Sequence, residues 1–134
     1  APEPGKRPRS SMAPTIAFAP DGHVLAFGSP GGSTIITTVV GIATNLIDFD
    51  MSLPEAISAP RLSQRNGSST TLEQSLDGSD EVKTLSELGH QFRLIDAIGA
   101  ATGLEIFPNG TIQAAAEPNR RGGGAAMVVQ QTVQ

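Results

Sequence analysis

The 134-residue sequence lacks cysteine, tryptophan and tyrosine, so five phenylalanines supply its large aromatic side chains. The absence of cysteine excludes disulfide bonds, thiol catalysis and cysteine-ligated metals. The two histidines, His23 and His90, lie in no metal-ligand or nucleophile–base pattern, so we expect both at the surface and no metal site. No phosphate-binding loop or dinucleotide motif is present either, and we therefore assign no cofactor.

The chain also lacks a long basic stripe and a long hydrophobic run. Its nine basic and thirteen acidic residues are scattered and give a net charge of −4, which disfavours nucleic acid and anionic membranes as partners. No apolar segment approaches the ~20 residues of a membrane span, so we expect no membrane insertion. The one basic cluster, Lys6-Arg7-Pro8-Arg9, directly precedes a serine pair, Ser10-Ser11. A solvated N-terminal segment is the ordinary interpretation of such a cluster.

Length and composition point to one domain or part of one. The 15 glycines and 10 prolines are typical of a turn-rich α+β protein. The first residues, Ala1-Pro2-Glu3-Pro4-Gly5, are neither a signal peptide nor an initiator start, which indicates an excised or processed chain. We expect residues 1–9 to form an extended lead-in and residues 122–134, which open with three glycines, to form a mobile tail.

Apolar runs that flank Asp-Gly and Asn-Gly turns predict two hairpins. The expected strands are 15–19, 24–28, 70–73, 92–96, 104–107 and 111–114. Because the strands of the first hairpin do not alternate between apolar and polar residues, we expect their sheet to be covered on both faces. Residues 61–67 are expected to form a loop, in which Arg61 is a candidate for a structural salt bridge.

Three helices are predicted. Apolar residues recur at helical spacing over residues 35–48, and Ser33 is the expected N-cap. Ser52-Leu53-Pro54-Glu55 is a capping-box sequence with proline in the first turn, and the helix that it opens should end before Pro60. The third helix is expected at residues 81–88.

The candidate site is the segment Ser29-Pro30-Gly31-Gly32-Ser33 at the entrance of the first predicted helix. Consecutive N–H groups there can converge on one anion, and the helix dipole adds partial positive charge. A two-residue turn at Asp21-Gly22 would place Ser11 opposite Gly32 and Ser10 opposite Ser33. A three-residue loop would shift this pairing by about one position. In either register the serine pair and the glycine pair are neighbours.

Each pair also has an ordinary structural interpretation. Gly31-Gly32 could be a turn that needs positive φ, and Ser10-Ser11 could be a solvated segment before a strand. Their expected proximity instead favours one wall of an active site, which would hold a carboxylate or a developing oxyanion. Arg7 and Arg9 are candidate helpers for the carboxylate.

Four segments carry a resemblance to a known family. They are Pro4-Gly5-Lys6-Arg7-Pro8-Arg9-Ser10-Ser11-Met12-Ala13-Pro14-Thr15, then Gly28-Ser29-Pro30-Gly31-Gly32-Ser33 with Ile35-Ile36-Thr37-Thr38, then Glu55-Ala56-Ile57-Ser58-Ala59-Pro60-Arg61, and finally Ala115-Ala116-Glu117-Pro118-Asn119-Arg120-Arg121. The first two are specific and closely resemble motifs of the γ-glutamyltranspeptidase family. The third resembles that family's Ala-Pro-Arg stretch, and the fourth resembles a drifted form of its terminal Asp-Pro-Arg region. The resemblance covers nearly the whole chain.

This resemblance implies an N-terminal-nucleophile hydrolase with an αββα sandwich. Family members cleave themselves into a large and a small subunit, and the new N-terminal Thr of the small subunit is the nucleophile. They transfer a γ-glutamyl group from glutathione-like donors to water or amino acids through an acyl-enzyme. By resemblance, Ser10 and Ser11 hold the donor's α-carboxylate, and the N–H groups of Gly31 and Gly32 form the oxyanion hole. A periplasmic or extracellular location is also implied by resemblance only.

The resemblance further implies that the rest of the active site lies on other chains. The sequence begins with Ala1, so the nucleophilic Thr is missing, as are the strands before the serine pair and a large-subunit arginine. We therefore expect residues 1–134 to be the C-terminal portion of a small subunit, incomplete as a domain and inactive alone. Its expected partners are the large subunit, the remainder of the small subunit and a small-molecule γ-glutamyl substrate. A related cephalosporin or glutaryl acylase and a non-catalytic binding module are the alternatives.

Overall fold

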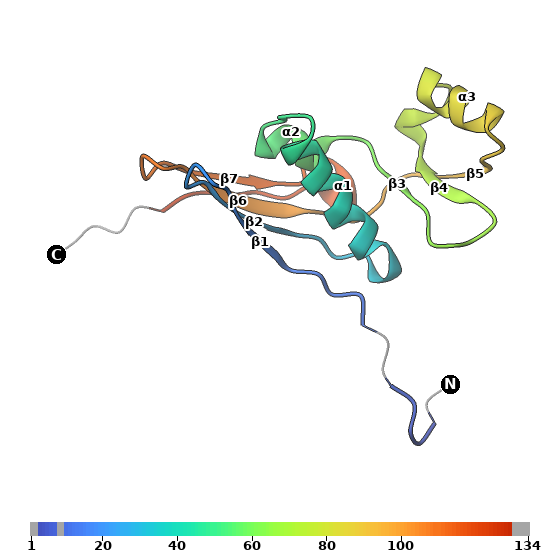
Figure 1. Ribbon diagram of the computed structural model, residues 1–134, viewed down its shortest axis with the longest axis horizontal. Coiled ribbons are helices and arrows are strands. Elements are labelled where there is room, and N and C mark those ends of the chain that lie inside the picture. Colours follow the sequence, from blue (N-terminus) through green and yellow to red (C-terminus); the bar gives the residue numbers. More distant parts are fainter. Residues whose placement is uncertain (1–2, 8–9, 130–134) are drawn as a thin grey trace.

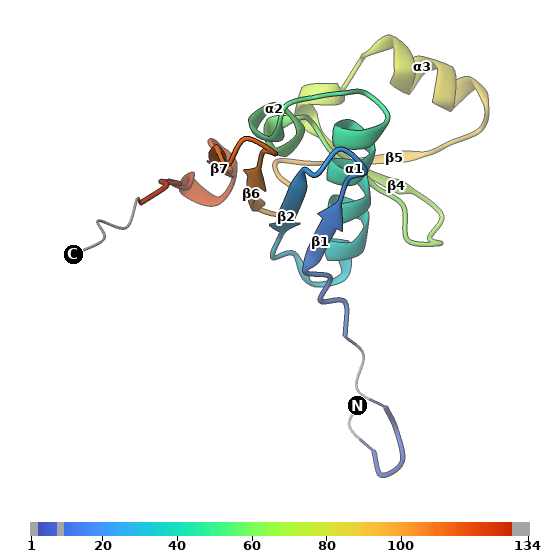
Figure 2. The same ribbon diagram turned by 60° about the vertical axis from the view of Figure 1, so that its left-hand side comes forward.

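The computed structural model describes residues 3–7 and 10–129, which form an α+β fold with two sheets (Figures 1 and 2). The larger sheet has the order β1-β2-β6-β7, and all its neighbouring strands are antiparallel. The smaller sheet has the order β3-β4-β5, in which β4 and β5 are parallel. The strands are β1 Thr15–Phe18, β2 Val24–Gly28, β3 Leu62–Ser63, β4 Thr70–Glu73, β5 Phe92–Ile95, β6 Thr102–Ile106 and β7 Ile112–Ala116. The helices are α1 Ile35–Ile47, α2 Leu53–Ser58 and α3 Asp80–Glu87, with 3-10 turns at Gly32–Thr34, Gln74–Leu76 and Arg120–Gly122.

The core lies between the four-stranded sheet and the helices α1 and α2, which cover one face of that sheet (Figure 2). Phe27 of β2 belongs to one buried cluster with Ile42 of α1 and Leu53 and Ile57 of α2. Full burial of such a side chain contributes roughly 1.5–3 kcal/mol. Gly103 of β6 permits this packing, because a Cβ at that position would lie 3.1 Å from Leu53 Cδ1. The site described below is therefore built on a packed scaffold.

The opposite face of the four-stranded sheet is apolar and is not covered by the residues that the structure describes. Ile16 and Phe18 of β1 are 66% and 79% exposed on this face. Leu104 and Ile106 of β6 and Ile112 of β7 are exposed on the same face. The sequence predicted that both faces of this sheet are covered, but the helices α1 and α2 cover only one of them. An αββα sandwich places a second sheet against such a face, so this chain contains one sheet and one helix layer of that architecture.

Both hairpins of the larger sheet close with three-residue loops. Gly22 and Gly110 end these loops with φ angles of 95° and 83°, the left-handed conformation that this loop type requires. The ladder pairs Thr15 with Phe27, which is one position away from the pairing that a two-residue turn would give. The alternative prediction, a three-residue loop at Asp21-Gly22, gives this shifted pairing.

All predicted helices and strands are present, with some ends shifted by one or two residues, and two local predictions were wrong. Ser33 is not the N-cap, because a 3-10 turn precedes α1 and places Thr34 at that position without a side-chain cap. Residues 61–67 are not entirely a loop, since Leu62 and Ser63 pair with β4 as the edge strand β3. The capping box of α2 is confirmed, with the Glu55 carboxylate accepting from the backbone N–H of Ser52 at 2.9 Å.

The N-terminal arm extends away from the body of the protein (Figures 1 and 2). The expected extended lead-in contains a turn, in which Lys6 N–H donates to Glu3 O at 3.2 Å and Gly5 adopts a φ of 80°. The first residues of the predicted tail are hydrogen-bonded to the rest of the protein, because Gly124 N–H donates to Glu117 O at 2.7 Å. Residues 1–2, 8–9 and 130–134 lie outside the described residues, so the prediction for Arg9 falls there, as does part of the predicted tail.

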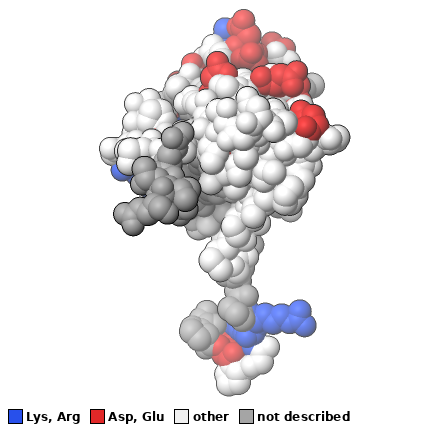
Figure 3. Space-filling view, turned by 90° about the vertical axis from the view of Figure 1, so that its left-hand side faces the viewer, with Lys and Arg blue, Asp and Glu red and all other residues white. Residues whose placement is uncertain are grey.

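Charge is unevenly distributed over the surface. Figure 3 shows acidic side chains gathered at the upper end of one face, at the height of α3 in Figure 1, and basic side chains on the N-terminal arm below. Most of the surface between them is uncharged in this view. In the part of the chain that the structure describes, no helix has the length and apolarity needed to cross a membrane.

Candidate functional site

The serine pair and the glycine pair lie together, as the first hairpin predicts. Ser11 Oγ donates a hydrogen bond to Gly32 O at 2.5 Å, although the two residues are 21 positions apart. Ser10 and Ser11 line a cavity of about 550 Å³ together with Ser33. Two serine hydroxyls therefore stand beside the entrance of α1, on the wall of a space large enough for a small molecule.

Gly31 and Gly32 adopt backbone conformations that other residues rarely reach, with φ angles of 153° and 56°. A Cβ at Gly31 would also lie 2.7 Å from Thr34 Oγ1, which is too close for a side chain. A Cβ at Gly32 would meet nothing within 4 Å. Gly31 is therefore required by both conformation and space, whereas Gly32 is required by conformation and borders open space.

The N–H groups of the glycine pair are available as donors. Within the described residues, neither Gly31 N–H nor Gly32 N–H donates a hydrogen bond. Their carbonyl groups are used, because Thr34 N–H donates to Gly31 O at 3.2 Å and Ser11 donates to Gly32 O. The first turn of α1 has no acidic residue, so the partial positive charge at this helix end has no local counter-charge.

The connection between β5 and β6 supports the glycine pair. Ala100 N–H donates to Ser29 Oγ at 3.0 Å, and Ser29 Oγ donates to Pro30 O at 2.7 Å. Gly99 adopts a φ of 73°, and a Cβ there would lie 2.5 Å from Ser29 Oγ. Only glycine allows this close approach. This support could not be predicted from the sequence, since an isolated glycine far along the chain gives no local signal of what it packs against.

A smaller cavity of about 180 Å³ lies next to Gly31. Gly31 lines it together with three arginines, Arg65, Arg93 and Arg121. No sequence pattern singled out Arg65 or Arg93, and Arg121 stood only within a segment that carries the family resemblance, because the three residues come from separate parts of the chain. Arg7 was the candidate instead, and this prediction has no support here because Arg7 lines neither this cavity nor the serine-lined one.

A buried network of two arginines and two glutamates joins the two sheets. Arg61 Nη2 lies 2.9 Å from Glu117 Oε2, and Arg120 Nη2 lies 2.5 Å from Glu73 Oε2. Arg120 Nη1 completes the network at 2.8 Å from Glu117 Oε1. All four side chains are at least nine-tenths buried. The predicted structural salt bridge of Arg61 is therefore confirmed, and its partners are residues that sequence spacing alone could not identify.

The pKa values of this network reflect burial and hydrogen bonding together. Burial alone would raise the pKa of Glu73, but hydrogen bonds from Arg120 and from the N–H groups of Ile98 and Arg61 hold it below its usual value. Burial and the charge of Arg120 lower the pKa of Arg61. Burial opposes the charge of Arg120, yet hydrogen bonds to Glu73 and Glu117 raise its pKa. The hydrogen bonds between Arg120 and Glu73 therefore favour the ionised form of both side chains.

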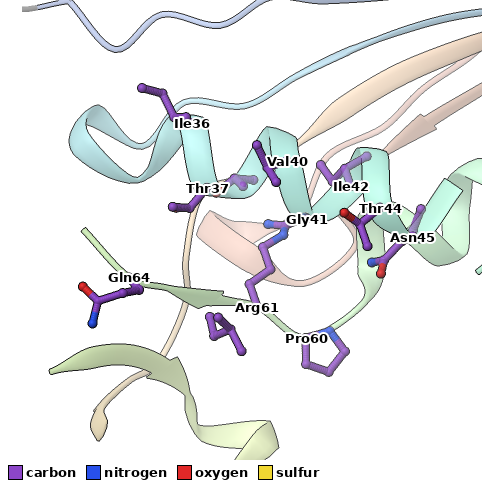
Figure 4. Close-up of a pocket in the computed structure, with 13 residues that line it drawn as sticks. Ile36, Thr37, Val40, Gly41, Ile42, Thr44, Asn45, Pro60, Arg61 and Gln64 are labelled. Atoms are coloured by element: carbon purple, nitrogen blue, oxygen red, sulfur yellow. The ribbon is translucent and has the colours of Figure 1, made fainter. Parts of the chain in front are cut away.

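A third cavity, of about 440 Å³, is a groove between α1 and the segment that contains β3 (Figure 4). Ile36 and Val40 project from α1, and Pro60 lies on the facing segment. Thr37 also lines the serine-lined cavity, where its Oγ1 shares a hydrogen bond of 2.7 Å with Ser63 Oγ. Arg61 is the one charged residue in the lining of the groove, and its guanidinium belongs to the buried network. This groove is suited to packing and offers no set of reactive groups.

The chain is similar in sequence to known proteins. The family model described as gamma-glutamyltranspeptidase matches residues 1–127 of the chain. The chain belongs to the γ-glutamyltranspeptidase family. A glutathione hydrolase proenzyme of Escherichia coli is 36% identical over 115 residues, which are 86% of this chain and 20% of the relative. A glutathione hydrolase proenzyme of Bacillus subtilis is 38% identical over 122 residues, which are 90% of this chain and 21% of the relative.

Solved structures of this γ-glutamyltranspeptidase family share the fold. A variant of Helicobacter pylori gamma-glutamyltranspeptidase superposes with a TM-score of 0.79 and 35% identity, over 87% of this chain and 64% of that one. The α+β fold of the N-terminal-nucleophile hydrolases, expected from the sequence, is thereby confirmed. This member of the family spans about a fifth of the length of the curated relatives it matches.

Proposed function

We propose that this chain supplies the oxyanion hole and the donor-carboxylate site of a γ-glutamyl hydrolase or transferase that other chains complete. The observation that carries the proposal is the hydrogen bond from Ser11 Oγ to Gly32 O. This contact sets two serine hydroxyls beside two N–H donors that have no partner within the described residues. A γ-glutamyl donor needs that arrangement, because a short aliphatic chain separates its α-carboxylate from the reacting γ-carbonyl.

In the proposed reaction, the nucleophile of another chain adds to the γ-carbonyl carbon, and the carbonyl oxygen becomes an oxyanion. The N–H groups of Gly31 and Gly32 donate hydrogen bonds to this oxyanion. The hydroxyl of Ser10 donates to the donor's carboxylate, and that of Ser11 does so after it turns away from Gly32 O. Collapse of the intermediate breaks the amide bond and releases the amine, which takes up a proton. Water or an amino acid then attacks the acyl-enzyme and releases the γ-glutamyl group. Donors that are fixed before the reaction contribute most at the oxyanion stage.

The partners and the substrate are part of the same proposal. Both relatives described above are named glutathione hydrolase proenzymes, which supports a glutathione-like donor. We infer that the large subunit and the remainder of the small subunit, with its nucleophilic Thr, complete the site, and that residues 1–134 are inactive without them. The open apolar face of the four-stranded sheet supports a need for such partners. A periplasmic or extracellular location stays a prediction.

The assembled protein tests this function. We expect it to cleave a γ-glutamyl anilide in preference to a glutaryl β-lactam. The reverse preference would favour the cephalosporin acylase alternative. Intact-mass analysis and N-terminal sequencing of the co-purifying chains should find one that begins with Thr. If no partner begins with Thr, Ser or Cys, the chain is a non-catalytic binding module.

Substitution of the serine pair should weaken binding of the donor. We expect Ser10→Ala and Ser11→Ala each to raise KM for a γ-glutamyl anilide about tenfold with a smaller effect on kcat, because hydrogen bonds to a charged group are lost in ground state and transition state alike. Steady-state kinetics on the assembled protein measure both constants. Ser75→Ala, at an exposed position outside both cavities, is the matched control. An equal rise in KM for 4-aminobutyryl anilide, which lacks the carboxylate, would contradict the assigned role.

A further inference from the structure

The cavity of about 180 Å³ beside Gly31 is lined by three arginines from distant parts of the sequence. Arg65 follows β3, Arg93 lies within β5, and Arg121 belongs to the 3-10 turn after β7. The fold rather than a local motif therefore creates this cluster.

These three charges have no acidic partner within the described residues. Arg65 donates to Ser33 Oγ, and Arg93 Nη2 donates to Thr71 Oγ1 at 3.2 Å, so both are oriented by neutral hydroxyls. Asp96 is adjacent in sequence to residues that line the cavity, but its side chain is exposed and forms no ion pair within the described part of the chain. No ion pair within the described residues therefore balances the positive charge of the cluster.

The two buried arginines differ from this cluster because they have acidic partners. Arg61 and Arg120 are matched by Glu73 and Glu117, so their charges are balanced inside the protein. Three unbalanced guanidinium groups around one small cavity repel one another, and an anion between them removes that cost. A carboxylate fits best, because the planar guanidinium group binds it through two parallel hydrogen bonds.

The position of the cluster indicates which carboxylate it would bind. Arg65 and Thr71 line both the arginine cavity and the serine-lined cavity. Gly31 borders the former and Ser33 borders the latter, so the segment that contains the glycine pair lies at the boundary between them. A donor whose γ-glutamyl group occupies the serine side extends its other half toward the arginines. The two residues of a dipeptide leaving group span about 7 Å when extended.

We propose that Arg65, Arg93 and Arg121 bind the C-terminal carboxylate of the donor's leaving group, and so select γ-glutamyl peptides over uncharged γ-glutamyl amides. This inference rests on the function proposed above, because it requires the glycine pair to face the reacting carbonyl. The serine pair and the arginine cluster would then hold the two ends of one donor, with the scissile bond between them.

A pair of donors that differ in one charge tests the proposal. The donors are glutathione and glutathione with its glycine carboxylate converted to a carboxamide. We expect the assembled wild-type protein to favour the free carboxylate about tenfold in kcat/KM, and to favour it less as salt is added. Arg93→Gln and Arg121→Asn should each reduce this preference toward unity, because kcat/KM falls more for glutathione than for the carboxamide. Asparagine is chosen for Arg121 because that residue has a φ of 51°.

The control is Lys83→Gln, which removes an exposed positive charge on α3 and should leave the preference intact. The proposal is wrong if the wild-type protein treats the two donors equally. It is also wrong if the arginine variants lower kcat/KM for both donors by the same factor, because the effect would then be structural.

A binding measurement separates failure of this site from failure of the proposed reaction. Calorimetric titration of the assembled protein with glycylglycine and with glycylglycinamide requires no turnover. Saturable binding of glycylglycine that Arg93→Gln weakens about tenfold supports the carboxylate site, even if the protein cleaves no γ-glutamyl donor. Equal binding of both dipeptides, or binding that Arg93→Gln does not change, overturns the site whatever the kinetics show.

Discussion

Replacing Gly32 by glycolic acid, which exchanges the N–H of this residue for an ester oxygen, is expected to lower kcat of the assembled enzyme by about 10²–10³. The ester is needed because proline, the natural residue without an N–H, fixes φ near −65° and cannot follow a backbone with a φ of 56°. Within the described residues this N–H has no partner, so its removal breaks no internal hydrogen bond. Steady-state cleavage of a γ-glutamyl anilide gives kcat, and KM should change little.

The matched control is the same replacement at Gly110, which also has a positive φ, 83°, and whose N–H donates to Phe107 O at 2.9 Å in the loop between β6 and β7. That ester weakens a hairpin loop and should leave kcat within about twofold of the wild-type value. A wild-type kcat for the Gly32 ester would assign the oxyanion hole to other donors. Equal losses at both positions would show that the ester acts through folding.

The second large effect is expected in stability. Arg120→Met should lower the free energy of unfolding by about 3–5 kcal/mol, because it leaves Glu73 and Glu117 buried with one arginine between them. Arg120 Nε also donates to Glu73 Oε1 at 2.6 Å and its Nη2 to Ala59 O at 2.9 Å, and both bonds would be lost. Urea unfolding of the assembled protein measures the change. Lys83→Met, which removes an exposed ion pair, should cost about 0–1 kcal/mol.

The loss caused by Arg120→Met should also depend on pH in a defined direction. Although burial alone would raise the pKa of Glu73, the hydrogen bonds from Arg120 contribute to holding it below the usual glutamate value. A carboxyl group with a lowered folded-state pKa stabilises the fold above its unfolded value of about 4.3, and this stabilisation is lost as pH falls through the folded-state pKa. The difference in the free energy of unfolding between wild type and Arg120→Met should therefore become smaller in acid. A difference that stays constant down to low pH would exclude this electrostatic explanation.

The local parts of the fold were predictable from the sequence because their signals are local. Asp21-Gly22 and Asn109-Gly110 identified both hairpins, and the first hairpin brought Ser11 to Gly32 across 21 residues of chain. The register could not be fixed, since an Asp-Gly sequence suits both two-residue and three-residue loops, and the loop here includes Pro20. The wrong N-cap has a similar cause, because glycines at positive φ allowed a 3-10 turn to replace the first helical turn.

The long-range parts of the site could not be predicted. Arg61 joins a network with Glu73, Glu117 and Arg120 only when the two sheets have formed. The spacing of these residues in the sequence does not indicate their contact. The same holds for Arg65, Arg93 and Arg121, which single-sequence analysis treats as scattered surface charges. Gly99 is also of this kind, because its contact with Ser29 depends on how β2 and β6 pair. Sequence patterns thus brought the serine pair to the glycine pair and missed the residues around them.

The hydrogen bond between Ser29 and Ala100 also has a consequence for biosynthesis. It joins residues 71 positions apart, and β2 pairs with β6 across the same stretch of chain. A ribosome adds about 5–20 residues per second, so Ala100 is synthesised roughly 4–14 s after Ser29. During that interval the glycine pair lacks the segment that fixes it, and the unpaired edge of β2 is exposed to other strands. The glycine pair therefore gains this support only after Ala100 has been synthesised.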